Sequence, residues 1–380
     1  MPLTKTKTNG SKMKKRVLIY VTLPPPVHGS NTMNQHVVDY MANTNAFDVE
    51  VLPLHYATSI KDIGIPRIGK IFSFIKYGFM LLKTLHRFRP DVVYFPIVAK
   101  NLPFYRDCFY VLLMKLYKTH IIYHLHLKGI KEKTKTPFIR GLYKWAFNNA
   151  SVILLSPILY TDMDHIIDRD QAVFVANGIP QPKVVGNAIK KEMAPEPKIL
   201  FLSNLVITKG PFTLLKACQI LKDRGYPFQV EFVGNPAGST GKNQFERLIK
   251  AYGIEDNVTL PGPKYNDEKD QALSDADIFV FPSWDECFPL VLLEAMSHGL
   301  PVVSTYEGAI PEIIDNGRTG FLVEKKNPED LADKIAWLID HPHERTKMGQ
   351  AGLEKYLTHY TLHHFQQKIA ATFHDIALAV

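Results

Sequence analysis

Short apolar runs alternate along the chain with stretches in which apolar residues recur every three or four positions. The runs lie at residues 16–22, 49–54, 91–95, 120–126, 151–156 and 172–175, and again at 199–202, 229–233, 258–263, 278–281 and 301–304. Their lengths and turn-forming boundaries are typical of buried parallel strands. Helical patterns cover residues 65–89, 104–117, 289–298 and 365–378. This alternation predicts an α/β protein with parallel sheets.

The clearest strand–loop–helix–strand unit lies at residues 277–305. Pro289 suits the first helical position, and Gly299 suits the position just past the helix end. Between them, Leu292, Leu293 and Met296 fall on one face. We therefore expect a helix that packs this face against two parallel strands.

Two glutamates occupy informative positions in this unit. Glu286 follows the first strand, and Glu294 lies eight residues later in the helix. Ligands of open parallel sheets bind beyond the carboxyl ends of the strands, and a helix amino end favours a phosphate. A carboxylate that binds a diol beside such a phosphate site suits a sugar nucleotide. By spacing alone, a solvated loop glutamate and a locally capping helix glutamate explain the pair equally well.

The wider segment is more specific. Residues 286–304, E-C-F-P-L-V-L-L-E-A-M-S-H-G-L-P-V-V-S, resemble the E-x7-E motif of the retaining glycosyltransferases of family 4. The preceding F-P-S strengthens the match, and the resemblance extends over residues 16–378, more closely in the second half. It implies an α/β protein with the GT-B fold, in which two Rossmann-like, doubly wound parallel-sheet domains face a central cleft.

The same resemblance assigns roles to donor-site residues. It implies that Glu286 holds the donor-sugar hydroxyls and that Glu294 holds the ribose. Lys209, in S-N-L-V-I-T-K-G-P, matches a lysine that contacts the donor phosphates. Asn204 stands where the family carries an arginine, so it offers only a neutral hydrogen bond to the diphosphate.

Two further segments complete the predicted donor site. In V-T-L-P-G-P and the lysine that follows, the resemblance places Gly262 and Lys264 near the nucleobase. At the helix start it places Phe288, Leu290 and Val291 beside the phosphates. The intervening proline has no N–H, so the backbone N–H groups of Leu290 and Val291 are the remaining donors there.

The first predicted strand is followed by T-L-P-P-P-V-H-G-S-N at residues 22–31. Gly29 and Ser30 match, in part, a two-glycine loop that lies near the donor diphosphate in the family. Ser30 or Asn31 could also cap the helix that follows. A capped helix start without a ligand therefore remains the alternative.

Residues 120–126, H-I-I-Y-H-L-H, place His124 and His126 on one face of a strand. The resemblance gives His126 the role of a strand-end histidine that approaches the donor sugar. His124 is the alternative, because a shift of two residues keeps the same face. No cysteine or carboxylate lies at ligand spacing, so we expect no metal at this position.

Composition agrees with two domains in a reducing compartment. A chain of 380 residues exceeds what one core usually supports. Its three cysteines, Cys108, Cys218 and Cys287, are scattered and not spaced for metal ligation or a disulfide framework. No apolar run approaches the roughly 18 residues of a membrane-spanning helix. We expect a cytoplasmic protein, peripheral at the inner face of the cell membrane, with a disordered basic tail at residues 1–14.

Charge is distributed unevenly between the two halves. Residues 1–190 carry 26 Lys+Arg and 11 Asp+Glu, a net charge of +15, whereas residues 191–380 carry 19 and 26, a net charge of −7. The amino half should therefore face an anionic partner, and no nucleic-acid motif is present. Residues 65–89 combine apolar positions such as Phe72 and Phe79 with six Lys and Arg, as in a helix at an anionic membrane surface. A helix packed on the sheet with a basic rim fits equally well.

Together with the resemblance, these features predict an acceptor-binding domain at residues 1–190 and a donor-binding domain at 191–360. The resemblance also implies that a helix at 361–380 returns to the first domain. The resemblance implies metal-independent, retaining transfer of a hexose to a hydroxyl of a glycan or lipid-linked oligosaccharide in bacterial surface polysaccharide biosynthesis. The donor would be a nucleotide-diphosphate sugar, with a UDP-sugar favoured over GDP-mannose. No cofactor is expected. The catalytic candidates are His126, Lys209 and Glu286. Alternatives are a nucleotide-sugar epimerase of the same fold, active on the donor alone, and a membrane-associated scaffold that binds no donor.

Overall fold

The computed structural model describes residues 14–25, 28–56, 68–182, 196–236 and 241–380. The chain divides into two compact units. The first takes in the chain up to His124, with Gly141–Val152 and Ala370–Val380, and the second holds Leu125–Arg140 and Ile153–Ile369. This division does not test the domain boundaries expected at residues 190 and 360, which stay predictions. The tail expected at residues 1–14 lies outside the described residues except for Lys14.

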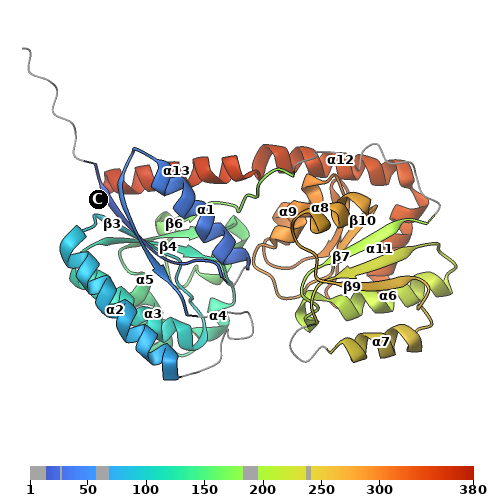
Figure 1. Ribbon diagram of the computed structural model, residues 1–380, viewed down its shortest axis with the longest axis horizontal. Helices are drawn as coiled ribbons and strands as arrows, with labels where there is room; N and C mark the ends of the chain where they lie inside the picture. The colour runs from blue at the N-terminus through green and yellow to red at the C-terminus, as the bar shows by residue number, and fades with distance from the viewer. Residues whose placement is uncertain (1–13, 26–27, 57–67, 183–195, 237–240) are drawn as a thin grey trace, which may run out of the picture. The chain divides into compact units, whose positions relative to one another are not determined.

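The first sheet has six strands in the order β2-β1-β3-β4-β5-β6 (Figure 1). Their bounds are β1 (Arg16–Thr22), β2 (Asp48–Leu54), β3 (Val92–Phe95), β4 (His120–Leu125), β5 (Ala150–Leu154) and β6 (Ala172–Phe174). β1 pairs in parallel with β2 and β3, and β3 pairs in parallel with β4. Each strand lies within two residues of its predicted run, which confirms these runs as strands.

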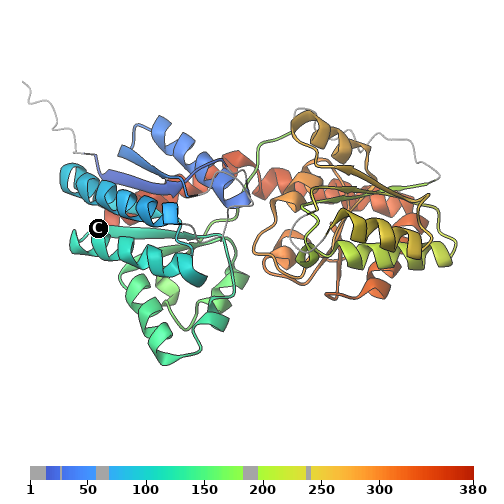
Figure 2. The ribbon, with the colours of Figure 1, turned by 60° about the horizontal axis from the view of Figure 1, so that its bottom comes forward.

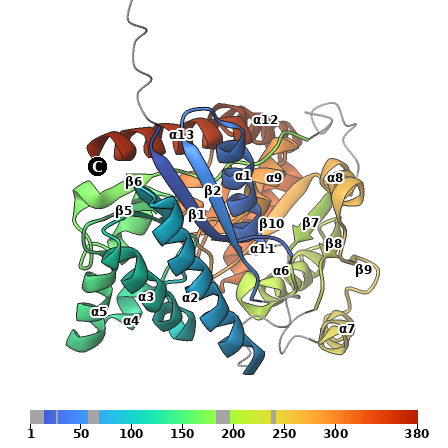
Figure 3. The ribbon, with the colours of Figure 1, turned by 60° about the vertical axis from the view of Figure 1, so that its left-hand side comes forward.

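The helices of this half are α1 (Gly29–Asn43), α2 (Ile68–Phe88), α3 (Asn101–Leu116), α4 (Ile130–Lys133) and α5 (Pro137–Phe147), with 3-10 turns η2 (Pro157–Asp162) and η3 (Arg169–Gln171). α1 contacts β1 and β2, and lies beside them in Figure 3. α2 and α3 pack side by side (Figure 2). The last helix, α13 (Leu362–Ala379), ends in the first unit, where Phe373 is buried with its ring 5.5 Å from that of Tyr94.

The second sheet has the order β12-β11-β10-β7-β8-β9. Its strands are β7 (Lys198–Leu202), β8 (Gln229–Val233), β9 (Val258–Gly262), β10 (Ile278–Phe281), β11 (Val302–Thr305) and β12 (Gly320–Val323), and all its pairings are parallel. Renumbered within this domain, the order is 3-2-1-4-5-6, that of a Rossmann domain. The apolar runs predict every strand except β12.

Helices cover both faces of this sheet (Figure 1). They are α6 (Pro211–Asp223), α7 (Lys242–Ala251), α8 (Asn266–Asp275), α9 (Leu290–Ser297), α10 (Ile310–Ile313), α11 (Pro328–Asp340) and α12 (Pro342–His359), with the 3-10 turn η5 (Ile207–Lys209). α6 packs with α11 on one face, and α9 packs with α12 on the other. The sheet is therefore doubly wound.

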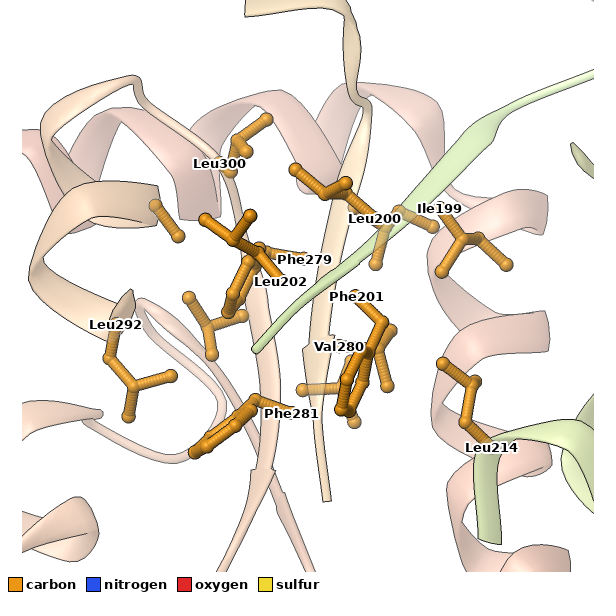
Figure 4. Close-up of a cluster of buried hydrophobic side chains, with 14 of the residues drawn as sticks. Ile199, Leu200, Phe201, Leu202, Leu214, Phe279, Val280, Phe281, Leu292 and Leu300 are labelled. Carbon is orange, nitrogen blue, oxygen red and sulfur yellow. The ribbon is translucent and has the colours of Figure 1, made fainter. Parts of the chain in front are cut away.

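A core of aromatic and aliphatic side chains fixes the central strands (Figure 4). Leu200 of β7 and Phe279 of β10 are fully buried and belong to one apolar cluster with Leu292 of α9. Leu293 and Met296 are also fully buried, which confirms the predicted inward face of this helix. Because β7 and β10 are held from both sides, the loops at their carboxyl ends start from fixed points.

Candidate functional site

The point at which the second sheet reverses direction lies between β7 and β10. These strands are neighbours, with Ile199 paired to Ile278, although β8 and β9 separate them in the sequence. The helices that follow them, α6 and α9, lie on opposite faces of the sheet. Their connecting loops, residues 203–210 and 282–289, therefore diverge around a crevice of the kind in which doubly wound domains bind ligands.

The two loops are bonded to each other. The hydroxyl of Ser283 and the backbone N–H of Trp284 both donate to the carbonyl oxygen of Thr208, at 3.0 and 2.9 Å. Gly210 has φ +80°, and a Cβ at this position would lie 2.1 Å from the carbonyl oxygen of Pro282. Only glycine fits this approach, so loop 203–210 is held directly against loop 282–289.

Lys209 and Glu286 meet where these loops touch. Their side chains form an ion pair, in which the Lys209 ammonium donates to Oε1 of Glu286. Both remain partly accessible, at 25% and 16% exposure. Two of the three catalytic candidates are thus in direct contact. The arrangement combines a cation that can bind phosphate with a carboxylate that can accept hydrogen bonds from sugar hydroxyls.

A buried glutamate that the sequence analysis missed supports this pair. Glu307 is 3% exposed and follows β11, and it contacts the ammonium groups of Lys128 and Lys325. Its Oε1 also accepts a hydrogen bond from the backbone N–H of Glu286, at 3.3 Å. Burial alone would raise the pKa of Glu307, but the hydrogen bonds from both lysines hold it below its usual value.

One sequence signal could have drawn attention to Glu307. It follows a strand in the same manner as Glu286, at the carboxyl edge of the same sheet, and it precedes a glycine. Gly308 has φ +53°, and a Cβ there would lie 2.3 Å from the carbonyl oxygen of Glu286. The loop after β11 therefore packs directly on the loop that carries Glu286.

The other predicted donor residues of this domain are spread over neighbouring loops. Glu294, in α9, forms an ion pair of 2.8 Å with Lys269. Gly262 ends β9 with φ +90°, which favours glycine. Lys264 pairs with the buried Glu231, whose other lysine partner is Lys198 at 2.8 Å. Burial opposes ionisation of Glu231, but the two lysines hold its pKa below the usual value.

The start of α9 differs slightly from the prediction. Pro289 is the residue before the helix rather than its first residue, and the helix begins at Leu290. The N–H groups of Leu290 and Val291 therefore lie in the first turn, where no intrahelical acceptor exists for them. Phe288 is 6% exposed and packs its ring 6.1 Å from that of Tyr360. Asn204, in contrast, is exposed at the end of β7.

The two histidines at the end of β4 have different surroundings. His124 is fully buried, and its Nδ1 lies 2.7 Å from the hydroxyl of Tyr94. His126 lies just past the strand and is half-buried. Of the two, only His126 is partly exposed, and its role at the donor sugar stays a prediction.

The basic segment after His126 is anchored. Both carboxylate oxygens of Asp162 are used, since they accept the backbone N–H groups of Gly129, Ile130 and Lys131 at 2.6, 2.8 and 2.9 Å. These bonds cap α4. Lys128, at the start of the segment, reaches Glu307.

In the first unit, α1 begins at Gly29, and His28 precedes it as the N-cap. Ser30 places its hydroxyl 3.0 Å from Nδ1 of His28, and Asn31 is buried with its Oδ1 3.0 Å from the hydroxyl of Thr22. The expectation that Ser30 or Asn31 caps this helix was therefore wrong. Asn31 instead ties the helix start to the end of β1.

Comparison with known proteins shows what the second half of the chain resembles. Residues 187–355 match the family described as Glycosyl transferases group 1. We name this region, which is similar to group 1 glycosyltransferases, the group 1 domain. The chain is 31% identical over 174 residues to WcaL of Escherichia coli, provisionally named a colanic acid biosynthesis glycosyltransferase. The aligned region covers 44% of this chain and 42% of WcaL. The chain is 34% identical over 184 residues to the D-inositol 3-phosphate glycosyltransferase of Paenarthrobacter aurescens, covering 48% and 44% of the two chains. The matched region thus spans less than half the length of these relatives.

Solved structures with the same fold cover nearly the whole chain. A glycosyltransferase from Rickettsia africae superposes with a TM-score of 0.76 at 18% identity, covering 96% of this chain and 98% of the other. Anabaena HepE in complex with UDP superposes with a TM-score of 0.73 at 17% identity, covering 94% and 99%. The group 1 domain is therefore one of two α/β domains in a chain with the GT-B fold.

Proposed function

We propose that this protein is a retaining, metal-independent glycosyltransferase. It moves a hexose from a nucleotide-diphosphate sugar to a hydroxyl of a glycan or lipid-linked oligosaccharide in bacterial surface polysaccharide biosynthesis. A UDP-sugar is the favoured donor, and GDP-mannose is the alternative. The observation that carries the proposal is the Lys209–Glu286 ion pair at the switch point of a group 1 glycosyltransferase domain.

In the proposed reaction, each residue has a distinct task. Lys209 and the N–H groups at the start of α9 offset the charge that develops on the leaving diphosphate. Glu286 orients the donor-sugar hydroxyls, Glu294 holds the ribose, and His126 lies near the anomeric carbon. Because Lys209 and Glu286 contact each other, the donor must insert at this pair and exchange part of their mutual contact for its own.

Carboxylate geometry supports a reaction without metal. The D-x-D spacing at Asp162 and Asp164 is the pattern that a metal-using transferase would require. Asp162 already accepts three backbone N–H groups, and Asp277, in a second such spacing, accepts the N–H of Lys198 at 2.7 Å. Both side chains therefore have structural partners.

UDP in the complex with HepE supports the choice of donor, and the name of WcaL supports the choice of pathway. The positive charge of the amino half supports association with the anionic inner face of the cell membrane. None of the helices in the described ranges is long and apolar enough to cross a membrane.

Thermal unfolding with a panel of nucleoside diphosphates tests the donor site. Ligand at ~100 Kd should stabilise the protein by ~2.7 kcal/mol. We expect UDP to stabilise the wild type with or without chelator and to lose this effect in Glu294→Ala. Glu354→Ala, which removes an exposed glutamate of α12, is the matched control and should respond like the wild type.

Activity separates transfer from the alternatives. With a saturating donor and an oligosaccharide acceptor, Glu286→Gln should lower kcat/KM by about 10²–10³-fold. Interconversion of the donor sugar without an acceptor would instead support the epimerase. If no nucleotide shifted the unfolding temperature, the result would contradict the proposed enzymatic function and favour the scaffold.

A further inference from the structure

Helix α2 has two apolar faces. The inner face is buried against the first unit through Tyr77, Leu81 and Leu85, which are 8%, 0% and 0% exposed. The outer face carries four apolar side chains that are 37–70% exposed: Phe72, Ile75, Phe79 and Leu82. Their spacing of three, four and three residues places them on one stripe. The helix is therefore packed on the domain and still presents an amphipathic surface outward.

Helix α3 repeats the arrangement. Its outer stripe, spaced by three and four residues, consists of side chains that are 40–72% exposed: Leu102, Tyr105, Phe109, Leu112 and Leu116. The two helices thus hold nine of the eighteen large apolar side chains that are exposed among the described residues. Monomeric proteins rarely leave so many apolar groups together in water.

The two stripes form one surface. α2 and α3 lie next to each other in Figures 2 and 3. Phe109 of α3 packs on Gly78 of α2, where a Cβ would lie 2.9 Å from its ring, and its centroid is 5.0 Å from that of Phe74. We name the two joined stripes the α2–α3 face. Helix α5 lies next to α3, since the ammonium of Lys115 in α3 is 5.9 Å from the ring centre of Trp145 in α5.

Among the described residues, the solvent-exposed charges of α2, α3 and α5 are all positive. α2, α3 and α5 contain eight Lys and Arg residues: Lys70, Lys76, Lys83, Arg87, Arg106, Lys115, Arg140 and Lys144. They contain one acidic residue, Asp107, which is 1% exposed and paired with Arg106 at 2.7 Å. No acidic side chain of these three helices is therefore presented to solvent among the described residues. Lys76, Lys83 and Lys144 are exposed.

We propose that the α2–α3 face inserts into the surface of an anionic lipid bilayer. Exposed aromatic and aliphatic side chains beside lysines are the composition of interfacial helices, whose apolar face enters the boundary between headgroups and acyl chains. The lysines attract acidic headgroups within about a Debye length. This deepens the membrane association proposed above by naming the surface, and it does not depend on the transfer reaction.

Charge favours lipid over a second copy of the chain. Two α2–α3 faces brought together would oppose lysines to lysines in an apolar contact, which is costly without compensating carboxylates. A bilayer surface instead supplies many mobile anions and an apolar layer at the same depth. The lysines of the α2–α3 face thus match the anionic headgroups, and its apolar side chains match the acyl layer.

Sedimentation of the full-length protein with vesicles tests the proposal without donor or acceptor. We expect binding to vesicles that contain phosphatidylglycerol and little binding to phosphatidylcholine alone. Phe72→Ser/Phe79→Ser and Lys76→Glu/Lys83→Glu should each weaken binding at least tenfold. Tyr265→Ser and Lys250→Glu, which change exposed residues of the second unit, are the matched controls and should bind like the wild type.

A labelled variant gives an answer even if the double variants fold poorly. Ile75→Cys carries an environment-sensitive fluorophore at a position that is 59% exposed, since the three native cysteines are buried. Its emission should shift to the blue with anionic vesicles, whereas a label at Tyr265→Cys should not respond. If the wild-type protein does not bind anionic vesicles, the proposal is overturned. So does a dimer in solution that Phe72→Ser/Phe79→Ser dissociates, because the face would then be a contact between copies. Failure here leaves donor binding and transfer unaffected, so the two proposals fail separately.

Discussion

Glu307 holds the backbone of Glu286: its buried carboxylate accepts the Glu286 N–H at 3.3 Å. It also contacts Lys325, at 2.8 Å, and Lys128. One carboxylate that is almost inaccessible therefore positions another that is accessible at the candidate site. We assign Glu307 a positioning role, distinct from contact with the donor.

Glu307→Gln should lower stability in a pH-dependent manner. The pKa of Glu307 is lowered in the folded protein, so its contribution is complete above the unfolded pKa of about 4.3 and is lost as pH falls through the folded value. We expect a loss of about 1–3 kcal/mol in the free energy of unfolding at pH 7. Urea unfolding at pH 7 and near pH 4 measures the difference. Glu329→Gln, at an exposed pair with Arg224, is the control. An equal loss at both pH values would contradict the assignment.

Gly210→Ala should separate backbone strain from the contact between loops. Gly210 and Gly225 have nearly the same φ, +80° and +78°, but only at Gly210 would a Cβ meet neighbouring atoms. Gly225→Ala should cost about 1–2 kcal/mol from the left-handed conformation alone. Gly210→Ala should cost at least about 2 kcal/mol more, because Pro282 must move. Chemical denaturation of both variants measures this, and equal losses would mean that the loops adjust freely.

Substitution of the two histidines should give different phenotypes. His126→Ala should lower kcat about 10²-fold with little change in melting temperature, as expected for a group that contacts the donor sugar. His124→Ala removes a buried ring bonded to Tyr94 and should cost about 3 kcal/mol of stability. Steady-state kinetics and thermal unfolding, measured on both variants, decide the assignment. A large kinetic effect confined to His124→Ala would reverse it.

The strands were predictable because a parallel strand covered on both faces leaves a continuous apolar run in the sequence. β12 was not, because Gly320–Val323 is short and follows a turn directly. The pattern at residues 65–89 allowed either a membrane helix or a packed helix, and α2 is packed through one apolar face while exposing another. Periodicity alone cannot say which of two apolar stripes faces the core.

The site was predictable only as far as its parts lie near one another in sequence. The resemblance placed Lys209 and Glu286 in donor loops, but their contact depends on β7 and β10 being neighbours in the sheet. Glu307 contacts Lys325, which lies 18 residues further along the chain, and Lys128, which comes from a segment far from it. Such clustering of charges is a tertiary property, and no local spacing indicates it.

The return of α13 to the first unit has a consequence for synthesis. Phe373 fills the first unit's core beside Tyr94 and Phe47, with ring centres 5.5 and 6.4 Å away. On the ribosome, this ring is made after the entire second sheet. The group 1 domain can therefore complete its own core while the first unit still waits for its last aromatic residue. During translation the domain made second should finish folding first.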